Sequence, residues 1–122
     1  HGFNDYGHFF DDTGEFLRLG GIASYAYDQR GFGGAPNIGS WAGVAAYKHD
    51  AVQAVQAVRQ RHPDLPVYLH GSSMGGAIAM LAASGPDSAP VDGVILAAPA
   101  IWSRDTMPWY QRLALWIGAH EP

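Results

Sequence analysis

A serine between two glycines is the part of this chain whose residue types and spacing fit a chemical role. Ser73 stands at the centre of a G-x-S-x-G pattern, Gly71–Gly75, directly after the apolar run Pro66–His70. A strand that reverses sharply into a helix forces its corner residue into a strained backbone, and small residues on either side let strand and helix pass without collision. The pattern therefore predicts that Ser73 exposes its hydroxyl above the carboxyl end of a sheet. The amide of Met74, directly after it, points at the same space and can receive a developing oxyanion.

The residues around the pattern support this prediction. Val67–Leu69 is a β-branched and aromatic run after a proline, which is typical of a short strand. Gly75–Ser84 is rich in alanine and other apolar residues and is followed by Gly85, which predicts a helix that ends there. A G-x-S-x-G pattern also arises by chance in a chain with 16 glycines. The strand before it and the helix after it favour the functional interpretation.

The composition bounds the class of protein. With 122 residues, 48% hydrophobic and 15% charged, the chain is one globular domain or part of one. The net charge of −4 and the scattered Lys and Arg residues argue against a nucleic-acid partner. The absence of cysteine excludes disulfides and a thiolate nucleophile, and no cofactor or metal site is indicated. The sequence leaves the localisation open and slightly favours the cytoplasm. No apolar run approaches the roughly 20 residues of a transmembrane helix.

Hydrophobic periodicity and turn residues predict alternating helices and strands after an N-terminal loop. The first helix should bury an apolar set, and the longest one should bury a stripe at steps of three and four. Short connections between alternating elements predict parallel strands with right-handed crossovers. The expected elements are a helix ending at Gly20, a strand over Ile22–Tyr27, a helix from about Trp41 to Arg61, a strand over 67–70, a helix over 75–84 and a strand over 91–98. The expected buried residues are Phe9, Phe10, Phe16, Leu17 and Leu19 in the first helix and Val44, Tyr47, Ala51, Val55 and Val58 in the longest.

The chain changes character after Pro99. It is aromatic and turn-like to residue 110 and then predicts a helix over 111–119. Its three tryptophans, Trp102, Trp109 and Trp116, fit two interpretations that the sequence leaves open. They form a corner of the core, or they line an apolar substrate cavity.

Four motifs in order resemble the α/β-hydrolase superfamily, and more closely its monoacylglycerol lipase and lysophospholipase-like branch. They are His1–Phe3, Asp28–Gly33 after a strand, Gly71–Gly76 at the sharp turn, and Ala97–Ala100 after the next strand. The resemblance implies a parallel-sheet, three-layer α/β sandwich of the α/β-hydrolase type, present here only in part. Residues 1–100 would form a partial core, from the loop after the third strand through the sixth strand. Residues 101–122 would begin a helical lid.

The resemblance also implies roles for individual residues. Ser73 would be the nucleophile, and the backbone amides of Phe3 and Met74 would form the oxyanion hole. Asp28 and Arg30 would brace the loop beside the site and do no chemistry. The glycines that allow the sharp turn would be Gly71, Gly75 and Gly76, and the residues that line the substrate cavity would be Trp102, Trp109 and Trp116. His70, next to the turn on its strand, is interpreted as a packed histidine and not as the catalytic base.

A serine hydroxyl needs a base within hydrogen-bond reach, and in this fold the order along the chain is Ser, acid, His. Asp105 with His120 satisfies this order, but the acid and the base should follow two later strands that the chain does not contain. We therefore expect both groups to lie outside these residues, so that the isolated chain has little activity and marginal stability. We also expect a gap between the strands at 22–27 and 67–70, where the resembled fold places another strand. The acids after Ser73 are Asp87, Asp92, Asp105 and Glu121, and the one histidine after it is His120.

The function expected is hydrolysis of carboxylic esters of lipid-like substrates, monoacylglycerol or lysophospholipid, through an acyl-enzyme on Ser73. The expected partner is a small lipid or ester substrate, with transient contact to a membrane or micelle surface allowed. A peptidase or another acyl hydrolase of the same fold is one alternative. A non-catalytic binding module of the same fold is the other.

Overall fold

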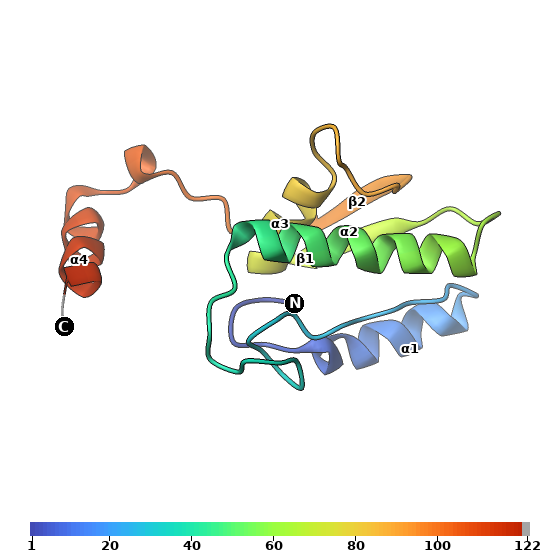
Figure 1. Ribbon diagram of the computed structural model, residues 1–122. Helices are drawn as coiled ribbons and strands as arrows, with labels where there is room; N and C mark the ends of the chain where they lie inside the picture. Colours follow the sequence, from blue (N-terminus) through green and yellow to red (C-terminus); the bar gives the residue numbers. More distant parts are fainter. Residues whose placement is uncertain (121–122) are drawn as a thin grey trace.

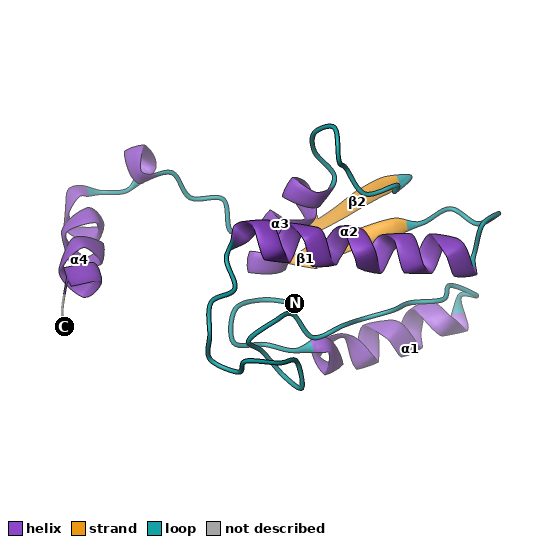
Figure 2. Cartoon of the chain, viewed as in Figure 1, coloured by secondary structure: helices purple, strands orange, loops and turns teal. Residues whose placement is uncertain are grey.

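The computed structural model describes residues 1–120, without the side chains of residues 104 and 118–120. Helices and strands alternate over residues 44–97, and the segments on either side contain helices and loops, as Figures 1 and 2 show. The elements are the 3-10 helix η1 (Gly7–Phe10), α1 (Asp11–Leu19), α2 (Val44–Arg61), β1 (Tyr68–Ser72), α3 (Met74–Ala82), β2 (Gly93–Ala97), the 3-10 helix η2 (Arg104–Thr106) and α4 (Trp109–His120).

The sheet is parallel, which confirms the expected α/β fold class. β1 pairs with β2 from Tyr68 opposite Gly93 to Ser72 opposite Ala97. Helix α3 connects the two strands and packs against both of them and against α2. This arrangement is consistent with part of the α/β-hydrolase fold that the sequence predicts.

The core lies between α2, α3 and the start of β1. In α2 the expected apolar stripe buries Tyr47, Ala51 and Val55, because residues three and four apart share a helix face. Tyr47 and Ala51 pack on Ile78 and Ala82 of α3, and Val55 packs on Val67 and Ala89. Val44 stays 55% exposed, at the first turn of the helix.

The strand expected over Ile22–Tyr27 is wrong. These residues take no part in a ladder, although they run beside α2, where the Tyr25 hydroxyl lies 2.8 Å from Nε2 of His62 (Figure 1). A strand is defined by hydrogen bonds to a neighbour, and within residues 1–120 β1 has one partner, β2. The β-type sequence therefore has no ladder to join here.

The burial expected of the first helix is also wrong. Phe16 and Leu19 of α1 are each 75% exposed, Phe9 of η1 is 58% exposed, and α1 has no buried residue. Amphipathic spacing predicts which face of a helix is apolar, but another layer has to cover that face. Within the described part of the chain the element that mainly contacts α1 is η1.

Beyond β2 the chain runs through η2 to α4, which stands apart from the sheet in Figure 1. The apolar side chains of this segment are exposed. No helix within residues 1–120 is long and apolar enough to cross a membrane. The exposed residues are Ile101, Trp102, Trp109, Tyr110, Leu113, Leu115, Trp116 and Ile117.

Candidate active site

Ser73 lies at a sharp turn between β1 and α3, and its side chain is exposed. Its backbone has φ 51° and ψ −117°, a conformation that costs a non-glycine residue about 1–3 kcal/mol. The turn after β2 holds it in place, since the Ser73 amide donates to the carbonyl of Ala97 and the amide of Ala100 donates to the carbonyl of Ser73, both at 2.9 Å. Ala98, which lies between Ala97 and Ala100 in the turn after β2, also has a positive φ of 44°. Two strained turns thus support each other at the carboxyl ends of both strands.

The three predicted glycines allow close backbone contacts around this turn. A Cβ on Gly71 would lie 2.5 Å from the carbonyl carbon of Gly75 and 2.7 Å from the nitrogen of Gly76. A Cβ on Gly75 would lie 2.7 Å from the carbonyl oxygen of His1, and one on Gly76 would lie 2.9 Å from Cα of Pro99. Each distance is shorter than real Cβ contacts allow, so strand, helix and both neighbouring loops approach each other only because these residues lack side chains.

The loop His1–Phe3 lies against the same turn, and we call it the oxyanion loop. A Cβ on Gly2 would lie 3.5 Å from Cβ of Ser73, which is ordinary van der Waals contact. Among the described residues the amide of Phe3 has no hydrogen-bond partner. Met74 is the first residue of α3, where amides have no acceptor within the helix. Two unused backbone donors thus belong to the segments that border Ser73.

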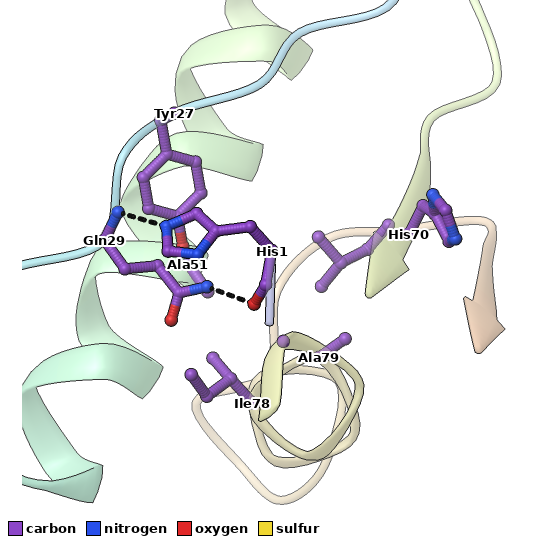
Figure 3. Close-up of a pocket in the computed structure, with 9 residues that line it drawn as sticks. His1, Tyr27, Gln29, Ala51, His70, Ile78 and Ala79 are labelled. Carbon is purple, nitrogen blue, oxygen red and sulfur yellow. Dashed lines mark hydrogen bonds between the residues drawn. The ribbon is translucent and has the colours of Figure 1, made fainter. Parts of the chain in front are cut away.

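Two residues to which the sequence analysis assigned no role, His1 and Gln29, hold the oxyanion loop. The backbone N–H of Gln29 donates to Nε2 of His1, and its side-chain amide donates to the His1 carbonyl, both at 2.9 Å (Figure 3). His1 and Gln29 are the buried polar residues of the described chain, 7% and 4% exposed. The available signal was their position, since each belongs to a recognised motif, His1–Phe3 or Asp28–Gly33.

The side chains of Asp28 and Arg30 each hydrogen-bond to another part of the chain. The Asp28 carboxylate accepts from the amide of Gly7 at 2.6 Å and from that of Gly34 at 2.7 Å, and these two bonds hold its pKa below the ordinary value. Arg30 forms a two-bond pair with Asp50 of α2, at 2.5 and 2.8 Å. Each residue thus ties the loop after Tyr27 to another segment of the chain.

Two hollows border the oxyanion loop. A small cavity of about 40 Å³ lies among His1, Tyr27, Gln29, His70 and the first turns of α3, as Figure 3 shows. Burial raises the pKa of Tyr27 to about 12, so its phenol stays neutral there. A wider hollow of about 350 Å³ lies on the Phe3 side of the loop. Its apolar lining residues are Phe3, Tyr6, Phe32, Ile38 and Trp41.

The remaining predicted residues do not gather at Ser73. Trp102, Trp109 and Trp116 are 77%, 74% and 55% exposed and line neither hollow. His70 is exposed on β1, with its ring 5.2 Å from that of Phe10. Asp105 lies in η2, and the side chain of His120 and all of residue 121 lie outside the described part. Among the side chains that the structure describes, no group of three or more His, Asp or Glu is placed to hold a metal ion.

Comparison with known proteins gives three matches. The model of a hydrolase family described as serine aminopeptidase, S33, matches residues 1–120. The chain is 32% identical over 104 residues to a monoglyceride lipase of Rattus norvegicus, covering 83% of this chain and 33% of that protein. It is 33% identical over 110 residues to a Schizosaccharomyces pombe protein named "Putative monoglyceride lipase", covering 83% of this chain and 28% of that protein. The chain thus spans about a third of the length of these relatives.

Proposed function

This chain belongs to the α/β-hydrolase family described as serine aminopeptidase, S33, and we propose that it carries the nucleophile and the oxyanion hole of a carboxylic ester hydrolase. The observation that carries the proposal is the backbone of Ser73, a non-glycine residue at φ 51° between a strand and a helix. Such strain persists only where the surrounding structure over-determines it, and it is concentrated at functional sites. The hydrogen bonds to Ala97 and from Ala100 are that support.

In the proposed reaction Oγ of Ser73 attacks the ester carbonyl carbon while a base takes its proton. The carbonyl oxygen becomes an oxyanion, which accepts hydrogen bonds from the amides of Phe3 and Met74. The C–O bond then breaks, the alcohol leaves with the proton, and the acyl group stays on Ser73. A water molecule hydrolyses this acyl-enzyme by the same steps, releases the acid and returns the proton to Ser73.

We propose that the acid and the base of this reaction come from sequence outside these 122 residues. The chain covers about a third of its relatives, and α4, which contains His120, stands apart from the turn at Ser73 (Figure 1). The isolated chain should then keep only binding and oxyanion stabilisation, a small part of full catalysis.

A lipid-like acyl ester, a monoacylglycerol or a lysophospholipid, is the proposed substrate. The names of the two relatives support an ester of this class. The exposed apolar residues of 101–117 support it as well, since an exposed apolar surface suits contact with an acyl chain or a micelle. We propose that residues 101–122 begin a helical lid over the site and that Trp102, Trp109 and Trp116 contact the substrate there.

The test is Ser73→Ala in the full-length protein that contains this chain, with a short acyl ester and a monoacylglycerol as substrates. Loss of the nucleophile should lower kcat by at least about 10⁴-fold. Ser72→Ala is the matched control, because it removes a hydroxyl from the adjacent residue at the end of β1 and should leave turnover unchanged. A fluorophosphonate probe should label the wild type and not the Ser73 variant. Absent labelling with folded protein would favour a non-catalytic binding module.

A peptidase is the second candidate, because the family description names an aminopeptidase. The same Ser73 and oxyanion hole would then act on an amide carbonyl. A panel of monoacylglycerols, lysophospholipids and aminoacyl amides on the full-length protein separates the two. Amide turnover that exceeds ester turnover would assign the site to peptides.

A further inference from the structure

The orientation of the Gly2–Phe3 peptide decides where the amide of Phe3 points. The structure has no cis peptide bond, so the carbonyl of Gly2 and the N–H of Phe3 point in opposite directions within one plane. The Gly2 oxygen lies 2.9 Å from Nδ1 of His1 and accepts from the amide of Asp5 at 3.3 Å. Whatever holds this oxygen therefore also sets the direction of the Phe3 N–H.

Gln29 determines which nitrogen of His1 carries the proton. A backbone N–H can only donate, so Nε2 of His1, 2.9 Å from the Gln29 nitrogen, must be an unprotonated acceptor. The proton of the neutral imidazole is then on Nδ1, which donates to the Gly2 carbonyl. The Gln29 side chain adds a second bond, from its amide to the His1 carbonyl. Figure 3 shows both bonds, one to the ring and one to the backbone carbonyl of His1.

Packing alone does not account for an amide at this position. Gln29 is 4% exposed, and within residues 1–120 its Oε1 is buried without a hydrogen-bond partner. A buried acceptor of this kind lowers stability, and an apolar side chain of the same length would avoid that penalty. What an apolar residue does not provide is the donor to the His1 carbonyl.

We propose that Gln29 is a positioning residue of the oxyanion hole, which acts through His1 to aim the N–H of Phe3. Its backbone N–H fixes the His1 ring and its side-chain amide fixes the His1 carbonyl. The ring then holds the Gly2 carbonyl, and the peptide plane turns the Phe3 amide toward the oxyanion. Neither Gln29 nor His1 touches the reacting atoms. This inference rests on the proposed function of Ser73 and Phe3.

The test is Gln29→Met in the full-length protein. Methionine keeps the length of the side chain, removes the donor and removes the unpaired Oε1. Because a misplacement of about 1 Å costs on the order of 100-fold, we expect kcat to fall by about 10-fold to 100-fold, with KM and the unfolding midpoint nearly unchanged. Tyr27→Phe is the matched control, since it lines the same cavity and makes neither bond. An unchanged kcat, or a fall that matches the loss of folded protein, would overturn the proposal.

A second variant covers the case in which Gln29→Met does not fold. Gln29→Glu has the same shape, and its introduced carboxyl donates to the His1 carbonyl when protonated but repels it when ionised. We expect kcat relative to the wild type to fall as the pH rises through the titration of this group. A ratio that does not change with pH would contradict the role of the donor.

A third measurement does not depend on turnover. Nitrogen NMR of His1 should show a protonated Nδ1 and an unprotonated Nε2 in the wild type and also in Gln29→Met, since that variant keeps the backbone N–H that donates to Nε2. A proton on Nε2 in the wild type would refute the proposal even if the enzyme is active. If the wild type shows no Ser73-dependent turnover, the proposed function fails, and this measurement still decides the role of Gln29.

Discussion

Gly71→Ala is the substitution whose effect the structure determines most directly. The new Cβ would lie 2.5 Å from the carbonyl carbon of Gly75 and 2.7 Å from the nitrogen of Gly76, where ordinary contact begins at 3.4 Å. The first turn of α3 or the end of β1 would have to retreat by roughly 0.7–0.9 Å in a close-packed interior. β1 is held by its pairing with β2, with Gly71 opposite Leu96, so most of the movement falls on α3.

Two effects follow from this movement. Overpacking costs about 1–3 kcal/mol, and since backbone atoms cannot turn aside as a side chain can, we expect a loss of about 3 kcal/mol. A shift of α3 by nearly 1 Å also displaces the amide of Met74, which should lower Ser73-dependent kcat by about 100-fold.

The assay is urea unfolding of the full-length protein together with ester turnover. Gly21→Ala is the matched control, because Gly21 has φ +77° and nothing within 4 Å of the added Cβ, which leaves backbone strain of about 1–2 kcal/mol and no clash. The reasoning is refuted if Gly71→Ala is no less stable than Gly21→Ala and keeps its kcat.

Two further substitutions test the supporting structure. Tyr47→Phe removes the hydroxyl that donates to the carbonyl of Arg30 at 3.0 Å, and it should lower the free energy of unfolding by about 1–3 kcal/mol. Tyr68 is 58% exposed, so Tyr68→Phe should leave the free energy of unfolding almost unchanged. The Asp92 carboxylate accepts hydrogen bonds from the amide of Val67 and from Arg59, and these bonds hold its pKa below the ordinary 3.8. The ionised carboxylate therefore stabilises the fold fully above the ordinary pKa. This stabilisation is lost as the pH falls through the lower pKa of the folded state. Asp92→Asn should therefore lower the melting temperature at neutral pH and flatten its fall between about pH 5 and pH 2; an unchanged slope would contradict this.

Local sequence was sufficient for the elements that carry the candidate site. The β-branched run at 67–69 and the alanine-rich stretch after Gly75 were predicted as strand and helix and form β1 and α3, with boundaries that differ by one to three residues. The stripe of α2 was confirmed at Tyr47, Ala51 and Val55, because that face meets α3. Each of these predictions depends on neighbours in sequence or on a face that the described chain itself covers.

The predictions that were wrong depended on neighbouring elements that the described chain does not provide. Ile22–Tyr27 has the composition of a strand and α1 has the pattern of a buried helix, yet both need a neighbour to pair with or pack against. Composition describes what a segment can bury or pair, and only the surrounding elements determine whether it does so.

The sequence by itself determined the kind of turn at Ser73, since glycines two residues before and after a serine between strand and helix leave few backbone solutions. Only the tertiary structure decided what stands around that turn. The contact of Gly2 with Ser73 joins residues 71 positions apart, and the bonds of Gln29 to His1 span 28. Such contacts follow no periodicity, because they depend on how loops from distant parts of the chain meet. For that reason the sequence placed His1 and Gln29 in motifs, and only the fold showed that they bond to each other.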